Sequence, residues 1–147
     1  KKIKTDMKKT IIILLLSFFF ISCQQKIKQE DIPKINGYWE IKHVEKDNKL
    51  LKEYNISSNV DYFEVNEETL TGFRKKVTPT LEGKFIINKH ESPFTLKIEG
   101  DELIISYNVN GNEYLETIKN ASKEKMVITN AEGITYVYRP FISINLE

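Results

Sequence analysis

The chain has 147 residues, of which 40% are hydrophobic and 29% are charged, and its formal net charge is +1 at neutral pH. These values are ordinary for a single globular domain. The single cysteine, Cys23, excludes an intrachain disulfide framework.

Residues 1–22 are predicted to lie outside the fold: residues 1–6 are upstream residues, and a targeting segment begins at Met7. Met7 precedes Lys8 and Lys9, and the apolar run from Ile11 to Ile21 is interrupted only by Ser17. This run is too short to span a bilayer, which takes about 20 residues. It fits the hydrophobic part of a secretory signal peptide.

The end of the run, Phe20-Ile21-Ser22-Cys23, resembles the lipobox of bacterial lipoproteins, which are cut before the cysteine and lipidated on its thiol. The resemblance implies a lipid anchor at Cys23, and two or more acyl chains hold a protein stably on a membrane. By analogy with enterobacterial lipoproteins, Gln24 after the cysteine favours the outer membrane of a Gram-negative envelope. An uncleaved signal anchor or a soluble secreted protein is the alternative.

Removal of residues 1–22 changes the charge. That segment holds five lysines and one aspartate, so the remainder has 17 basic and 20 acidic residues and a net charge of −3. A chain of this charge is not expected to bind nucleic acid. Residues 23–34, which are polar and contain Pro33, predict a flexible tether, and residues 35–147 predict the folded domain.

From Ile35 onward the hydrophobic pattern has a period of two, which predicts strands with one buried face. Gly100, Asn110-Gly111 and Gly133 mark turns between them. One segment, residues 48–55, is a candidate for a short helix or a loop. The expected strands are residues 38–45, 60–65, 71–77, 83–88, 94–100, 102–109, 114–119 and 134–140.

The fold class predicted from these elements is all-β, an antiparallel up-and-down meander of about eight strands that closes into a barrel. A β-sandwich is the alternative. Gly37-Tyr38-Trp39 resembles the Gly-x-Trp that opens the first strand of lipocalins, as found in bacterial envelope lipoproteins. The resemblance implies that Arg139, near the end of the last strand, lies over the Trp39 indole and closes one end, with a ligand at the other.

Three consecutive cations, Arg74, Lys75 and Lys76, lie on one expected strand. Alternation places Arg74 and Lys76 on one face and Lys75 on the other. Whichever face points inward could bind the carboxylate of an amphiphile, and the alternative is a solvated edge strand. The predicted ligand-binding residues are Arg74, Lys76, Phe94, Leu96, Ile105 and Tyr107.

Nothing in the sequence predicts catalysis, a metal site or a cofactor. His43 and His90 lie on separate segments, and no Cys/His cluster or phosphate-binding loop occurs. The sequence therefore predicts that the protein is not an enzyme. It predicts a membrane-anchored protein that binds a small apolar or amphiphilic molecule. The alternative is a filled barrel that binds another envelope protein through exposed aromatic residues, with Tyr38, Tyr54, Tyr62 and Tyr114 as anchors.

Overall fold

The computed structural model describes residues 26–56 and 58–143, and of these the side chains of residues 88 and 89 are not described. The predicted signal segment and Cys23 therefore lie outside the described residues. Within the described residues, no helix has the length and apolar character needed to cross a membrane. The elements are η1 (Gln29–Ile35), β1 (Gly37–Lys46), β2 (Lys49–Glu53), β3 (Val60–Asn66), β4 (Thr71–Pro79), β5 (Phe85–Glu99), β6 (Glu102–Val109), β7 (Asn112–Ala121), β8 (Met126–Asn130) and β9 (Ile134–Pro140).

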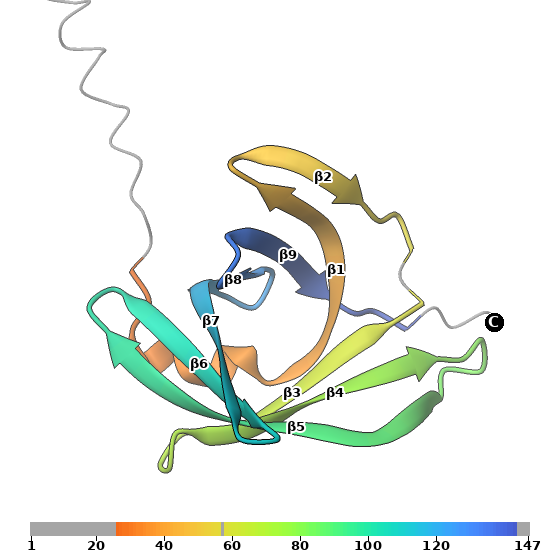
Figure 1. Ribbon diagram of the computed structural model, residues 1–147. Coiled ribbons are helices and arrows are strands. Elements are labelled where there is room, and N and C mark those ends of the chain that lie inside the picture. Colours follow the sequence, from red (N-terminus) through yellow and green to blue (C-terminus); the bar gives the residue numbers. More distant parts are fainter. Residues whose placement is uncertain (1–25, 57, 144–147) are drawn as a thin grey trace, which may run out of the picture.

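Eight of these strands form a closed antiparallel barrel, which confirms the predicted fold class and leaves no place for a sandwich. The order runs from β1 to β3 and then through β4 to β9, and β9 pairs again with β1. Strand β2 is an extra strand that pairs only with the second half of β1. Figure 1 shows the ring of strands, with the β1–β2 hairpin rising from it.

Up-and-down connectivity places alternate turns at opposite ends of the barrel. We call the end with η1 and the β3–β4, β5–β6 and β7–β8 turns the closed end, and the opposite end the open end. Ile32 and Ile35 of η1 are fully buried in the apolar core at the closed end, together with Trp39. The Trp39 indole N–H donates a hydrogen bond of 2.8 Å to the carbonyl oxygen of Ile35, so η1 and β1 are fixed to each other.

The segment predicted as a flexible tether is part of this closed end. Residues 29–35 form η1, and the Asp31 carboxylate accepts the Lys28 backbone N–H at 2.9 Å and the Lys34 ammonium at 2.5 Å. These interactions satisfy the polar groups around a short helix whose isoleucines lie in the core. The tether prediction is therefore wrong for the described residues up to Lys34, because burial of Ile32 and Ile35 offsets the entropic cost of ordering the segment.

Three of the strands also differ from the predictions. Residues 49–53 form β2 and no helix, because Asp47 and Asn48 both adopt positive φ and make a tight hairpin turn. The expected strands 83–88 and 94–100 are two parts of the single strand β5. Strand β8 was not predicted, since its five residues give too short an alternation to be recognised. The turns at Gly100, Asn110-Gly111 and Gly133 occur as predicted, with positive φ.

Candidate functional site

A cluster of charged side chains lies inside the barrel, above the apolar core. Arg74 of β4 is its centre: one Nη2 hydrogen bond of 2.6 Å reaches Asp61 of β3, and an Nη1 hydrogen bond of 3.4 Å reaches Glu116 of β7. Lys76 adds a contact of 3.2 Å to Asp61. The Arg74 guanidinium also lies over the Phe63 ring, 5.2 Å from its centroid. The strand register explains this arrangement, because Arg74 is opposite Phe63 and Lys76 is opposite Asp61 on the inner face.

Two tyrosines complete the cluster. The Tyr138 hydroxyl accepts a hydrogen bond of 2.8 Å from Arg74 and donates one of 3.1 Å to Asp61. The Tyr107 hydroxyl donates one of 3.1 Å to Glu116. A buried charge is tolerated when it is paired and hydrogen-bonded, and these contacts meet that condition for Arg74 and Asp61.

The protonation states follow from the same contacts. Burial raises the pKa of Asp61, but the charges and hydrogen bonds of Arg74 and Lys76 outweigh burial and hold that pKa below its usual value of 3.8. Burial lowers the pKa of Arg74, yet Tyr138 and Asp61 more than offset it, and the pKa is raised. Burial raises the pKa values of Tyr107 and Tyr138. At neutral pH the cluster therefore contains a charged Arg74, an ionised Asp61 and two neutral tyrosines.

A cavity of about 380 Å³ lies between this cluster and the open end of the barrel. Its wall comes from four consecutive strands, β4 to β7, and most of its side chains are polar. The lining residues are Arg74, Lys76, His90, Ser92, Tyr107, Val109, Tyr114 and Glu116. The cavity therefore gives a small molecule access to a buried guanidinium.

A larger hollow of about 690 Å³ lies elsewhere, on the outer face of β3 to β6. Three of its polar side chains take part in hydrogen bonds within the protein: Glu64 accepts from Tyr62, Ser106 donates to Glu113, and Asn108 accepts the Gly111 N–H. We therefore regard the smaller inner cavity, which reaches the charged cluster, as the candidate site.

The model of one protein family, described as the lipocalin-like domain, matches residues 35–128 of this chain. The chain belongs to this family. Among solved structures, the lipocalin-like chain is similar to a lipocalin-like protein from Bacteroides uniformis ATCC 8492, with 12% sequence identity and a TM-score of 0.44. That similarity covers 74% of this chain and 99% of the other. A comparison with curated proteins finds no match.

The lipocalin-like barrel brings together three of the predicted binding residues. Arg74, Lys76 and Tyr107 line the cavity, so the inward pair of cations is Arg74 and Lys76. The alternative of a solvated edge does not apply, because β4 pairs with both β3 and β5.

Three other predicted binding residues lie deeper. Phe94, Leu96 and Ile105 are buried at 3%, 5% and 0% exposure in the apolar core and do not line the inner cavity. The alternating pattern correctly predicted that these three side chains point inward. It did not predict how far along the barrel axis they lie. Because the core at their level is filled, they support the cavity from below.

The predicted contact between Trp39 and Arg139 is wrong. Arg139 is opposite Glu40 in the β1–β9 pairing, and its Nε donates a hydrogen bond of 2.7 Å to that carboxylate. Trp39 is opposite Pro140 and points into the core at 3% exposure. Neighbouring residues of a strand point to opposite faces, so Arg139 lies outside the barrel wall. The closed end is covered by η1.

Sequence reasoning missed the carboxylates and several lining residues. Glu116 shares one face of β7 with Tyr114 and Ile118, and Asp61 shares one face of β3 with Phe63 and Val65. An acidic residue within an otherwise apolar inward face was the signal that could have found both. The remaining missed residues are Tyr138 within the cluster and His90, Ser92, Val109 and Tyr114 in the cavity wall.

Proposed function

We infer that this lipocalin-like protein is a lipid-anchored envelope protein that holds a small amphiphilic molecule in the inner cavity. The inference rests on the hydrogen bonds of Arg74 and on its position in the cavity wall. Its contacts to Asp61, Glu116 and Tyr138 use three of its five N–H groups. Arg74 also shares a side-chain hydrogen bond with Tyr107, and its guanidinium, 19% exposed, lines the cavity where a ligand can reach it.

The chemistry of the wall suggests the polar end of the ligand. Arg74, Lys76, Ser92 and Tyr114 can all donate hydrogen bonds into the cavity. The Lys76 side chain is 64% exposed, so it can turn from Asp61 toward a ligand at small cost. A carboxylate, or a comparable hydrogen-bond acceptor, fits this set of donors.

The apolar part of the ligand is limited in length. Val109 and Tyr114 offer apolar surface near the mouth, whereas the interior below the cluster is filled by packed side chains. The cavity, of about 380 Å³, has apolar surface only near its mouth and is closed below by packed side chains. It therefore fits a short amphiphile better than a long acyl chain.

The ligand proposal is tested by calorimetric titration of the chain from Lys26 onward with octanoate and with octanol. We expect octanoate to bind more tightly. Lys76→Met should weaken octanoate binding by about 5- to 30-fold, the scale of a lost charge-assisted hydrogen bond, and leave octanol binding unchanged. Lys84→Met is the matched control, because Lys84 is 80% exposed in the β4–β5 turn. Equal affinity for both probes, or an equal effect of both variants, would contradict the proposal.

The anchor is tested separately. Wild-type protein expressed with labelled palmitate should carry the label, and Cys23→Ala should carry none, because the thiol is the attachment point implied by the lipobox resemblance. Label retained by Cys23→Ala would place the acyl chains elsewhere or refute the anchor.

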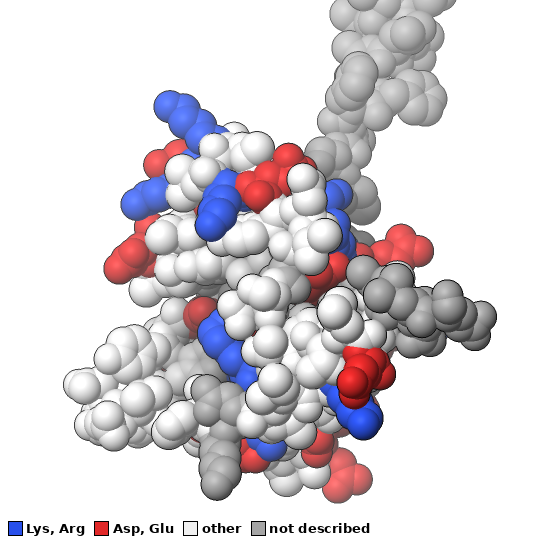
Figure 2. All heavy atoms as spheres, turned by 90° about the vertical axis from the view of Figure 1, so that its right-hand side faces the viewer, with Lys and Arg blue, Asp and Glu red and all other residues white. Residues whose placement is uncertain are grey.

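An adaptor that binds another envelope protein is the second candidate, and one observation favours it. Aromatic rings form a row on the outer face: Tyr38 stacks on Phe85 at 4.5 Å and lies 4.7 Å from Tyr62, and Phe85 lies 5.6 Å from Phe141. On the face turned to the viewer in Figure 2, charges of both signs are interspersed with uncharged surface. Failure of both probes to bind, combined with loss of a copurifying envelope protein in Tyr38→Ala, would favour the adaptor.

A further inference from the structure

The first described residues fix where the chain enters the domain. Ile27 is buried, and its N–H donates a hydrogen bond of 3.3 Å to the carbonyl oxygen of Asp101. The Lys26 ammonium lies 3.0 Å from the Asp101 carboxylate. Asp101 belongs to the β5–β6 turn, so the chain enters beside this turn at the closed end.

The distance from this point to the anchor is short. Cys23 precedes Lys26 by three residues, and three residues span at most about 11 Å when fully extended. Strand β6, Glu102–Val109, leads from the same turn to the open end. At about 3.4 Å per residue this strand is roughly 24 Å long, and a tilt of about 40° leaves roughly 18 Å along the barrel axis. The link to Cys23 is therefore shorter than the barrel.

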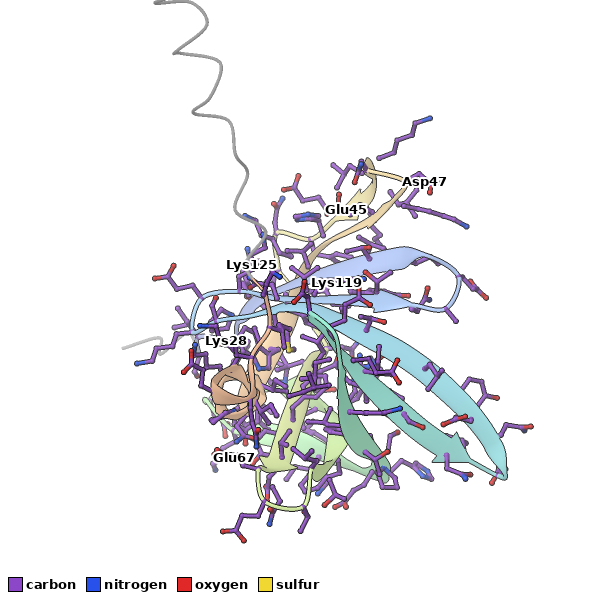
Figure 3. All side chains as sticks on the ribbon, turned by 90° about the vertical axis from the view of Figure 1, so that its left-hand side faces the viewer. Lys28, Glu45, Asp47, Glu67, Lys119 and Lys125 are labelled. Atoms are coloured by element: carbon purple, nitrogen blue, oxygen red, sulfur yellow. The ribbon has the colours of Figure 1, made fainter. Side chains whose placement is uncertain are left out.

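Exposed lysines lie around the entry point at the closed end. Lys26, Lys28, Lys123 and Lys125 are all exposed there. Lys26 is paired with Asp101 and Lys28 with Glu30, whereas Lys123 and Lys125, on either side of exposed Glu124, form no ion pair with a described residue. Figure 3 shows Lys125, from the β7–β8 turn, and Lys28 near the start of the described chain. Lysines close to an anionic bilayer surface are attracted to it.

We propose that the lipidated protein rests on the membrane through its closed end, so that the mouth of the cavity faces away from the supporting bilayer. The ligand then enters from the aqueous side or from a facing partner and does not pass directly from the lipids beneath. This inference depends on the anchor in the proposed function, and it adds the direction in which the cavity exchanges its ligand.

The test uses two labels at opposite ends of one strand. Cys23 is the only cysteine, and lipidation blocks its thiol, so a second cysteine can be labelled selectively. Glu124→Cys precedes β8 at the closed end, and Glu132→Cys follows β8 at the open end. Both glutamates are exposed turn residues, which makes them a matched pair.

Each acylated, fluorescently labelled variant is inserted into vesicles of phosphatidylethanolamine and phosphatidylglycerol that contain a headgroup-linked quencher. We expect at least threefold stronger quenching at position 124 than at position 132. Replacing Lys123 and Lys125 by Gln should weaken quenching at position 124 in these vesicles but not in vesicles of phosphatidylcholine alone. Equal quenching at both positions, or stronger quenching at 132, would overturn the proposed orientation.

Mass spectrometry of the same samples separates this result from a failure of the proposed function. An acylated protein with equal quenching refutes the orientation and leaves the anchor intact. A protein without the diacylglycerol mass refutes the anchor and the orientation together. Octanoate titration of the chain from Lys26 onward reports on the cavity independently of either result.

Discussion

Arg74 and Arg139 are the two arginines of the chain, and the structure gives them opposite environments. Arg74 is enclosed by the barrel and holds Asp61 and Glu116, whereas Arg139 lies outside and contacts Glu40 and the carbonyl oxygen of Asn55. A buried ion pair is weak evidence for net stability, because both charges were first removed from water. Loss of one partner nevertheless leaves the other charge uncompensated.

Arg74→Met should therefore lower the free energy of unfolding by about 3–5 kcal/mol, because ionised Asp61 would lose its main buried partner. Arg139→Met is the control for loss of an arginine. It should cost about 1 kcal/mol or less, since a partly exposed ion pair is screened by solvent. Urea unfolding followed by tryptophan fluorescence measures both, and similar losses for the two variants would contradict the assigned environments.

Asp61 links the stability of the same cluster to pH. Its pKa in the folded protein is lower than 3.8, because Arg74 and Lys76 outweigh the effect of burial. A carboxyl with a lowered folded-state pKa contributes stability that is fully present above the unfolded pKa, about 4, and is lost as the pH falls through the folded pKa. The free energy of unfolding should therefore fall with decreasing pH below about pH 4.

Asp61→Asn removes this titration. We expect the variant to be less stable at pH 7 and to lose less stability than the wild type between about pH 4 and pH 2. Urea titrations at a series of pH values measure both curves. Parallel curves would show that Asp61 does not contribute to acid sensitivity.

At the scale of single elements, Gly72 explains how β4 and β5 pack against each other. A Cβ at this position would lie 2.3 Å from the Glu64 carbonyl oxygen and 2.7 Å from Cζ of Phe94. The absent side chain thus makes room for the Phe94 ring, which packs edge-on against Tyr107 at 5.7 Å. Tyr107 in turn donates a hydrogen bond to Glu116. The glycine at position 72 of β4 therefore supports one wall of the cavity.

Gly72→Ala should destabilise the protein by about 1–3 kcal/mol, the usual cost of overpacking a core, because backbone as well as a ring would have to move. Thr71→Ala, at the exposed neighbouring position, should change stability by no more than about 0.5 kcal/mol. Thermal unfolding of both variants checks this. A Gly72→Ala protein as stable as the wild type would mean that β4 and β5 can separate freely here.

The sequence was sufficient to predict most strands, because alternation identifies inward residues such as Ile105 and Tyr107, and glycine turns separate the strands. It was not sufficient for the cluster. The partners of Arg74 come from residues 13 and 42 positions away, and only strand register brings them together. The same limit explains the error at Arg139, because whether it faces Trp39 depends on its pairing with Glu40.

For the whole molecule, the barrel architecture implies an uneven distribution of local stability. Strands β2 and β8 have five residues each. Strand β8 is paired on both sides, by β7 and β9, and contributes Met126 and Ile128 to the core. Strand β2 is paired on one side only, and all of its residues are exposed, including Leu50 and Leu51. A strand opens locally more readily when it has few buried apolar contacts and when its hydrogen bonds are exposed to solvent.

We therefore predict that the amide protons of β2 exchange with deuterium at least 100-fold faster than those of β8. Opening of β2 leaves the ring of eight strands intact, so exchange in β2 should report local opening and stay unchanged in Ile128→Ala. Exchange in β8 requires disruption of the barrel, and Ile128→Ala should accelerate it, because loss of a buried isoleucine costs about 2–5 kcal/mol. Hydrogen exchange resolved by NMR or mass spectrometry distinguishes the two strands. Equal protection of β2 and β8 would show that the β1–β2 hairpin unfolds only together with the barrel.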